Sequence, residues 1–245
     1  MKIFLLLFFI LGFSFNSFAQ DERTWRVSIG GGLVFKKNLR VGNTYEHLDK
    51  KYIVKPIPIL TGSIGRFSLG PQGIAVRAIG NQGMSLSAFI KREGDRYHGV
   101  GMDDRKDSVF VGLSAKFLKF GLNVSKDIGG RSHGYLTQLT YGEFYPISGS
   151  FFLRAGVSID WMDDRYSEYY YSVRKTEATA DRSEYHLNNY FQPGVSVLPI
   201  YKLSPNTSLM GALSAKFVPK DVRDSRTMNG KKIDFGGLIG FTYTL

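Results

Sequence analysis

The stretch FFLRAGVSIDW, from Phe151 to Trp161, decides the fold class. Its odd-numbered positions carry apolar side chains, whereas its even-numbered positions from Arg154 onward carry Arg, Gly, Ser and Asp. Successive side chains of a β-strand point to opposite faces, so this alternation predicts a strand with one apolar face and one small or polar face.

The same alternation recurs in segments that include 25–35, 109–117, 208–217 and 235–245. Their second face carries mostly small residues, with an occasional charge. A soluble sandwich tends to carry long charged side chains on its wet face, whereas small residues suit the crowded interior of a modest barrel. The sequence therefore predicts an all-β fold, an antiparallel transmembrane β-barrel. The expected strands cover residues 24–35, 51–62, 65–70, 73–79, 83–92, 108–118, 119–126, 133–144, 150–161, 188–201, 207–217 and 233–245.

The connections between these strands are of two lengths. Long polar connections cover residues 36–50, 93–107, 162–188 and 218–232. With twelve strands, all of them fall at one end of the barrel and the short turns fall mostly at the other, which is the pattern of outer-membrane barrels. Residues 65–79 hold two pieces too short to span at about 9–11 residues each, so they form one bent strand or a tucked hairpin. Ten strands remain an alternative.

The N-terminus predicts a cleaved secretory signal peptide. A positive start at Met1-Lys2 precedes an apolar run over 3–15, and Ser17-Phe18-Ala19 places small residues where signal peptidase reads them. We expect cleavage between Ala19 and Gln20, with residues 1–19 as the signal and residues 20–245 as one barrel domain. The predicted location is the bacterial outer membrane.

Composition excludes several classes. The chain has 245 residues, no Cys and a net charge of +11, and its mean hydropathy is −0.14. A helical multi-span membrane protein would need several apolar runs of roughly 20 residues, and the low mean hydropathy excludes that class. Without Cys there is no lipoprotein anchor, disulfide or thiol nucleophile. The basic residues form no dense stripe, so nucleic acid is not expected as a partner, and anionic lipopolysaccharide is the expected counter-charge. Five basic residues are expected to face the lumen: Arg26, Arg77, Lys116, Arg154 and Lys216.

Two motifs lie next to expected strands: DWMDDRYSEYYYSV, from Asp160 to Val173, and DIGGRSHG, from Asp127 to Gly134. They resemble the MipA/OmpV family of outer-membrane proteins, the first through that family's W-x-D-x-x-Y…Y-Y-G-V pattern and the second through its upstream D…G-H-x-G. The run from Val54 to Val76 also resembles the family. The chain departs from the family pattern at Ser172, where Gly is usual, at Arg226, where Pro is usual, and at Leu245, where an aromatic residue is usual. The residues that carry the two motifs are Asp160, Trp161, Asp164, Tyr166, Tyr170, Tyr171 and Val173, with Asp127, His133 and Gly134.

This resemblance implies an outer-membrane barrel with no family-wide enzyme activity. It implies a structural or scaffold role in envelope assembly, with a periplasmic murein hydrolase and murein synthase as partners. Outer-membrane lipid is the other expected contact. A small pore or uptake channel is the alternative function.

Catalysis and cofactor binding are not expected. The four His residues lie far apart without metal-ligand spacing, so no metal or cofactor is predicted. Ser132-His133 is the one adjacent Ser/His pair, and neighbours on a strand point apart, which makes a rim hydrolase the least favoured hypothesis. The acidic and Tyr-rich connection 162–188 leaves three interpretations: a calcium site, a surface that recognises a partner, or an internally salt-bridged loop with interfacial Tyr. Its interleaved cations count against calcium, and the salt-bridged loop is favoured.

Overall fold

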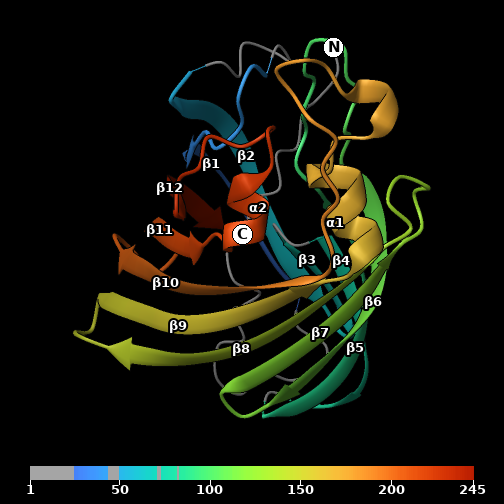
Figure 1. Cartoon of the computed structure of the whole chain (residues 1–245). Helices are drawn as coiled ribbons and strands as arrows, with labels where there is room; N and C mark the ends of the chain where they lie inside the picture. The colour runs from blue at the N-terminus through green and yellow to red at the C-terminus, as the bar shows by residue number, and fades with distance from the viewer. Residues whose placement is uncertain (1–24, 44–49, 71–72, 82) are drawn as a thin grey trace.

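The computed structural model describes residues 25–43, 50–70, 73–81 and 83–245, so the predicted signal peptide lies outside the described residues. Within these ranges, twelve strands form a closed barrel in which neighbours in sequence pair antiparallel and β1 closes on β12 (Figure 1). The prediction of twelve strands is confirmed, and the alternative of ten is wrong. The strands are β1 (Arg26–Lys37), β2 (Tyr52–Ile64), β3 (Phe67–Gly70), β4 (Gly73–Gly80), β5 (Met84–Glu93), β6 (Ser108–Phe117), β7 (Phe120–Asp127), β8 (Tyr135–Pro146), β9 (Phe151–Met162), β10 (Tyr190–Lys202), β11 (Thr207–Phe217) and β12 (Ile233–Thr244).

The segment 65–79 forms a tucked hairpin. β3 is only four residues long, and it pairs with the end of β2 from Gly62 to Ile64 and with the start of β4. Gly65 begins the turn before β3 with a φ of 55°, which glycine adopts without the strain that a Cβ would add. The register between β4 and β5 shifts between Arg77 and Ile79, as at a β-bulge.

The alternation seen in the sequence separates the two faces of the wall. On β1, Ile29 and Leu33 point outward and are 47% and 48% exposed, whereas Val34 points into the lumen and is 2% exposed. This is the arrangement of a barrel whose apolar face meets lipid. Aromatic side chains are exposed near both ends of the outer face, as expected at membrane interfaces; they include Trp25, Phe117, Tyr145, Tyr201 and Tyr243 at one end and Tyr52, Tyr135, Phe191 and Phe217 at the other.

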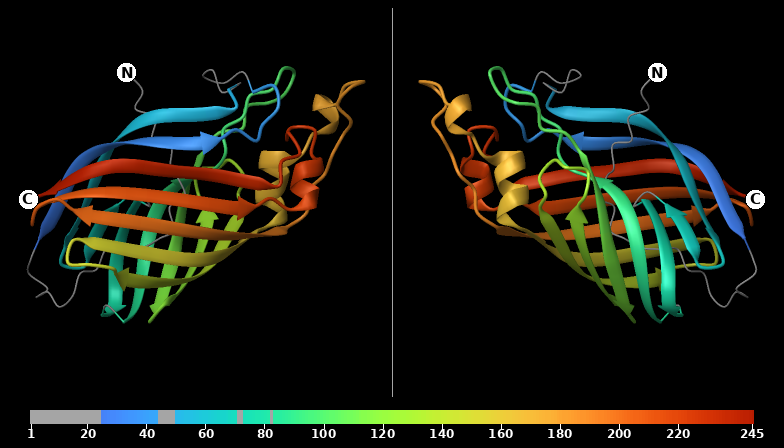
Figure 2. Two further views of the ribbon diagram at one scale, coloured as in Figure 1. Left: turned by 90° about the vertical axis from the view of Figure 1, so that its left-hand side faces the viewer. Right: turned by 90° about the vertical axis from the view of Figure 1, so that its right-hand side faces the viewer.

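The two ends of the barrel differ. The long connections gather at one end, called here the loop end, together with α1 (Asp164–Tyr171), the 3₁₀ turn η2 (Lys175–Glu177) and α2 (Lys220–Asp224) (Figure 2). The C-terminus and the short turns lie at the opposite end, the turn end. The sequence predicted these connections as loops and did not predict the helices. No helix in the described part of the chain is long and apolar enough to cross a membrane.

Candidate functional site

The connections at the loop end pack together into one layer, called here the loop cap, made of residues 38–43, 94–107, 128–134, 163–189 and 218–232. Its apolar core joins cap residues to inward side chains at the ends of β6, β8, β9 and β10. The core consists of Leu39, Phe110, Leu136, Met162, Tyr166, Tyr170, Leu187, Tyr190, Val218, Val222 and Met228. The loop cap therefore lies over the lumen at this end (Figure 1).

Helix α1 carries most of the first sequence motif. Asp163 caps its N-terminus by accepting a hydrogen bond from the Tyr166 backbone N at 2.9 Å. Tyr166 and Tyr170 face the barrel and pack with ring centroids 4.5 Å apart, and the Tyr170 hydroxyl donates to the Lys106 carbonyl at 3.0 Å. Burial raises the pKa of both phenols well above their usual value, so both stay neutral and serve as packing groups.

Arg40, which no local sequence pattern marks, lies at the centre of the loop cap and is 6% exposed. Its guanidinium donates to the Asp95 carboxylate at 2.9 Å, to the Thr227 hydroxyl at 2.9 Å and to the Tyr170 carbonyl at 2.8 Å. It also lies over the ring of Tyr171, with 4.5 Å to the centroid. The guanidinium of Arg40 thus links four connections of the barrel. Its planar group with five N–H donors in a fixed geometry suits this role.

Asp95 is the anionic partner of this cluster. It contacts Arg40 and also Lys36, whose Nζ lies 3.5 Å from the Asp95 carboxylate. Burial alone would raise the pKa of Asp95, but the charges of Lys36 and Arg40 and their hydrogen bonds outweigh it and hold the pKa below its usual value. Asp95 is therefore ionised at neutral pH.

A second buried ion pair, Arg105 with Glu177, ties the 94–107 connection to the 163–189 connection. The two side chains are 1% and 3% exposed and meet at 2.7 Å. Glu177 also accepts from the backbone N of Asp103 and of Arg174, both at 3.0 Å. Burial would raise the pKa of Glu177, but the hydrogen bonds from Arg105 and these two amides lower it overall.

The acidic connection 163–189 is thus paired largely with the 94–107 connection, through Arg105–Glu177 and Arg174–Asp103. Its internal ionic contacts are those of His186 with Glu168 and Glu184, so the interpretation of an internally salt-bridged loop describes only this part of it. Among the described residues there is no group of three or more potential metal ligands placed to hold an ion.

The upstream motif forms a tight loop around Asp127, which is 1% exposed. Its carboxylate accepts from the hydroxyls of Ser108 and Ser132, at 2.5 and 2.9 Å. It also accepts from the backbone N of four following residues, Gly129, Arg131, Ser132 and His133. The Ser132 hydroxyl therefore points to Asp127, and His133 is exposed with a φ of 56°. This pair does not have the arrangement in which a His activates a Ser.

The two motifs meet at Gly134. A Cβ built on Gly134 would lie 2.6 Å from both the Asp163 carboxylate and the Tyr166 backbone N. Only glycine leaves room for the start of α1 at this point. The motif residues Asp127, His133 and Gly134 thus position a loop against the helix that carries Tyr166 and Tyr170.

The remaining motif residues are spread over three environments. Asp164 is exposed in the first turn of α1, Trp161 is half-buried on the outward-facing side of β9, and Val173 is fully buried against Tyr97 and Met102. Tyr171 packs its ring on Tyr190 with centroids 6.1 Å apart. The structure does not bring these residues into one catalytic or binding centre.

The lumen contains a polar cluster around Asp160, which is 3% exposed. Lys216 contacts it at 2.6 Å from β11, and the Gln138 amide donates to it at 2.7 Å from β8. The other four predicted lumen cations, on β1, β4, β6 and β9, alternate with outward apolar residues: Arg26, Arg77, Lys116 and Arg154. Inward positions carry more basic than acidic side chains, so the described lumen wall is positive.

Comparison with known proteins gives the family. The family model described as "MltA-interacting protein MipA" matches residues 29–245. The chain belongs to the MipA family. Its similarity to individual members is moderate: it is 28% identical over 166 residues to outer membrane protein Omp26La of Vibrio anguillarum, covering 62% of this chain and 64% of that protein.

Two further MipA-family relatives give similar values. Identity to outer membrane protein OmpV of Vibrio cholerae is 28% over 150 residues, which is 56% of this chain and 58% of that one. Identity to the MltA-interacting protein of Escherichia coli is 27% over 149 residues, or 58% of each. The chain thus spans less than two thirds of the length of these relatives. Among solved structures, the COG4313 outer membrane channel from Pseudomonas putida F1 aligns with a TM-score of 0.45 at 10% identity, covering 91% of this chain and 96% of that chain.

The family and the closed barrel agree on location. The relatives are outer membrane proteins by name, and the barrel exposes an apolar wall between two aromatic belts. This MipA-family barrel lies in the outer membrane. Outer-membrane barrels place short turns in the periplasm and long loops outside the cell, so the turn end faces the periplasm and the loop cap faces the cell exterior.

Proposed function

We propose that this MipA-family barrel is a structural scaffold for murein-processing enzymes, which it holds at the periplasmic face of the outer membrane. The observation that carries the proposal is the loop cap, whose core packs directly on inward side chains of the barrel. Two buried arginines fasten this layer. A barrel whose outer end is packed in this way suits a fixed platform better than a wide passage. A relative named MltA-interacting protein supports a murein hydrolase as the partner.

Affinity capture tests the scaffold role. The full barrel, tagged in an outward loop so that the periplasmic turns stay free, is extracted in mild detergent from envelopes that retain other known complexes. We expect a murein hydrolase or murein synthase among the recovered proteins. If neither is recovered while the other envelope complexes survive, the scaffold proposal is wrong. A variant such as Lys220→Ala, an exposed change in the loop cap, serves as the matched control and should capture the same partners.

A narrow pore is the second candidate, because basic side chains such as Arg77, Lys116 and Arg154 stand on inward positions of the wall. A positive lumen favours anions. The pore hypothesis therefore predicts a steady conductance with a reversal potential that shows anion preference, and loss of that preference when these three residues are replaced by Gln.

A further inference from the structure

Beside β2 the barrel is closed only by the short strand β3. β1 pairs with β2 along nearly its whole length, but on the other side β3 reaches only the last residues, from Gly62 to Ile64. Beyond the short hairpin, β4 begins at Gly73 and pairs with β5 as far as Ile90. Among the described residues, the edge of β2 from Val54 to Leu60 therefore has no strand beside it.

The sequence of β2 fits an unpaired edge. Alternate residues of an antiparallel strand direct their backbone groups to opposite sides. Pro56 and Pro58 stand opposite Leu33 and Gly31 of β1, and since proline has no N–H, their side of the strand must point away from β1. The two prolines thus remove two donors that would be left unpaired at membrane depth, where such groups are costly.

Contacts within the loop cap lie at the loop end of this edge. Arg40 joins Asp95 at 2.9 Å, and the Tyr97 hydroxyl donates to the Val41 carbonyl at 3.0 Å. These bonds connect the chain leaving β1 to the chain leaving β5. The part of the wall that no described strand fills, called here the lateral window, lies between Val54–Leu60 and the end of β5, with β3 and the start of β4 on its turn-end side and these contacts on its loop-end side.

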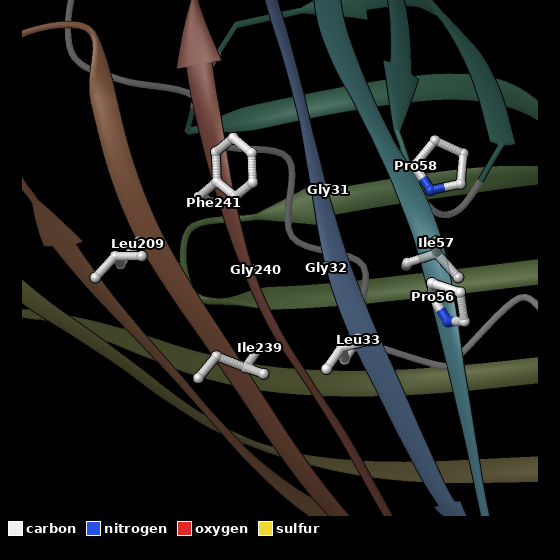
Figure 3. Close-up of a pocket in the computed structure, with 10 residues that line it drawn as sticks. All are labelled: Gly31, Gly32, Leu33, Pro56, Ile57, Pro58, Leu209, Ile239, Gly240 and Phe241. Atoms are coloured by element: carbon white, nitrogen blue, oxygen red, sulfur yellow. The ribbon is translucent and has the colours of Figure 1, made fainter.

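Apolar surface lies on both sides of the window. On the lumen side, Ile57 and Ile59 of β2 join a buried cluster that includes Val34, Leu198 and Leu238. On the outer side, a groove of about 780 Å³ crosses β11, β12, β1 and β2 and ends at Pro56 and Pro58 (Figure 3).

Figure 3 shows the form of that groove. Gly31 carries no side chain on the outer face, the backbone of Gly32 and Gly240 completes the floor, and Leu33 and Ile239 border it. A flexible chain lying in this groove would meet the edge of β2 and, behind it, the apolar lumen cluster. The shape and apolar lining match an acyl chain, the commonest apolar chain at this depth of a membrane.

Basic residues gather where the head group of such a chain would lie. Lys50 and Lys51 are exposed just before β2, and Lys55 lies on β2 two residues before Ile57. Arg92 is exposed on β5 across the window, where it pairs with Asp107 at 2.7 Å, so the cations offered to a head group are chiefly Lys50 and Lys51. Cations at the membrane surface attract anionic head groups. We propose that the lateral window admits an acyl chain of a surrounding membrane lipid with an anionic head group, so that the chain reaches Ile57 and Ile59.

Photocrosslinking tests the proposal on the full barrel refolded into phosphatidylglycerol vesicles. The photoreactive residue p-benzoylphenylalanine replaces Ile57 in one variant and Lys55 in a second, both inward on the window edge. Leu33, which points outward, is the positive control. Ser114, which points inward from β6 between Ser87 and Asn123, is the matched inward control. Heat-dependent gel mobility shows which variants are folded.

We expect lipid adducts at Ile57 and Lys55 in a yield near that at Leu33 and about tenfold above that at Ser114, because a hydrogen-bonded wall excludes lipid from the lumen. In phosphatidylcholine vesicles the yield at the two window positions should fall by about fivefold, while that at Leu33 stays the same. Yields at both window positions that do not exceed the yield at Ser114, in folded protein, overturn the window. Equal yields in the two lipids overturn the anionic head group.

Discussion

Replacing Arg40 by Met should loosen the loop cap while leaving the barrel intact. Met keeps much of the side-chain length but removes three charge-assisted hydrogen bonds, to Asp95, Thr227 and Tyr170. Breaking a buried ion pair costs about 3–5 kcal/mol. In this variant Asp95 still has Lys36 at 3.5 Å, and its side chain is 27% exposed to water. Both features reduce the free-energy cost of removing Arg40. We therefore expect the free energy of cap opening to fall by about 3 kcal/mol.

Hydrogen exchange measures this opening directly. The Val41 amide donates to the Thr227 carbonyl at 3.0 Å and the Asn229 amide donates to the Leu39 carbonyl at 2.8 Å, so both report on the cap. A loss of about 3 kcal/mol corresponds to exchange about 100-fold faster. Arg92→Met is the control, because its side chain is 45% exposed and an exposed pair contributes at most about 1 kcal/mol. The reasoning is refuted if both amides exchange as slowly in Arg40→Met as in Arg92→Met.

Three further predictions follow from the charged clusters. Asp127→Asn should lower the free energy of opening of the loop after β7 by about 2 kcal/mol, because the amide places an NH₂ against backbone N–H donors. Unchanged hydrogen-exchange protection of that loop would contradict this. Acidification should loosen the loop cap: the pKa values of Asp95 and Glu177 lie below their usual 3.8 and 4.5, so their stabilising contribution is complete above those values and is lost as the pH falls through the lowered pKa. Protection factors of cap amides should therefore drop between pH 6 and pH 2 relative to strand amides, and an equal drop in both would count against the assignment. Lys216→Met should destabilise the barrel by about 3 kcal/mol in urea unfolding, since it leaves Asp160 buried without its cation, and adding Asp160→Asn should restore most of the loss; a double variant no more stable than the single one would show that the pair is not the cause.

The strands were predictable because the environment of each face of a strand, lipid or lumen, determines which residues that face carries. In the stretch from Phe151 to Trp161, lipid contacts one face and the crowded lumen the other, so a local period of two carries the fold. The tucked hairpin was predicted only as one of two forms, because pieces as short as Phe67–Gly70 gain their structure from the neighbours they pair with.

The loop cap could not be predicted in the same way. Its organising residue, Arg40, finds its partners 55 and 187 positions away, at Asp95 and Thr227, and no local spacing signals such contacts. Helix α1 was missed because the sequence DRYSEYYY is rich in Tyr, which favours strands, and its helix depends on the Asp163 cap and on packing against the barrel. The motif residues were found through resemblance, but the resemblance did not show that some of them, such as Tyr166, Tyr170 and Gly134, pack within the loop cap.

Ion conductance across a planar bilayer tests the central claim, that the packed loop cap makes this barrel a fixed platform. The wild-type barrel and Arg40→Met are inserted under identical conditions, with insertion confirmed independently by protease protection. The account predicts that the wild type carries no steady current and that Arg40→Met shows openings, because the cap then separates from the lumen. A steady wild-type current as large as that of Arg40→Met would contradict it.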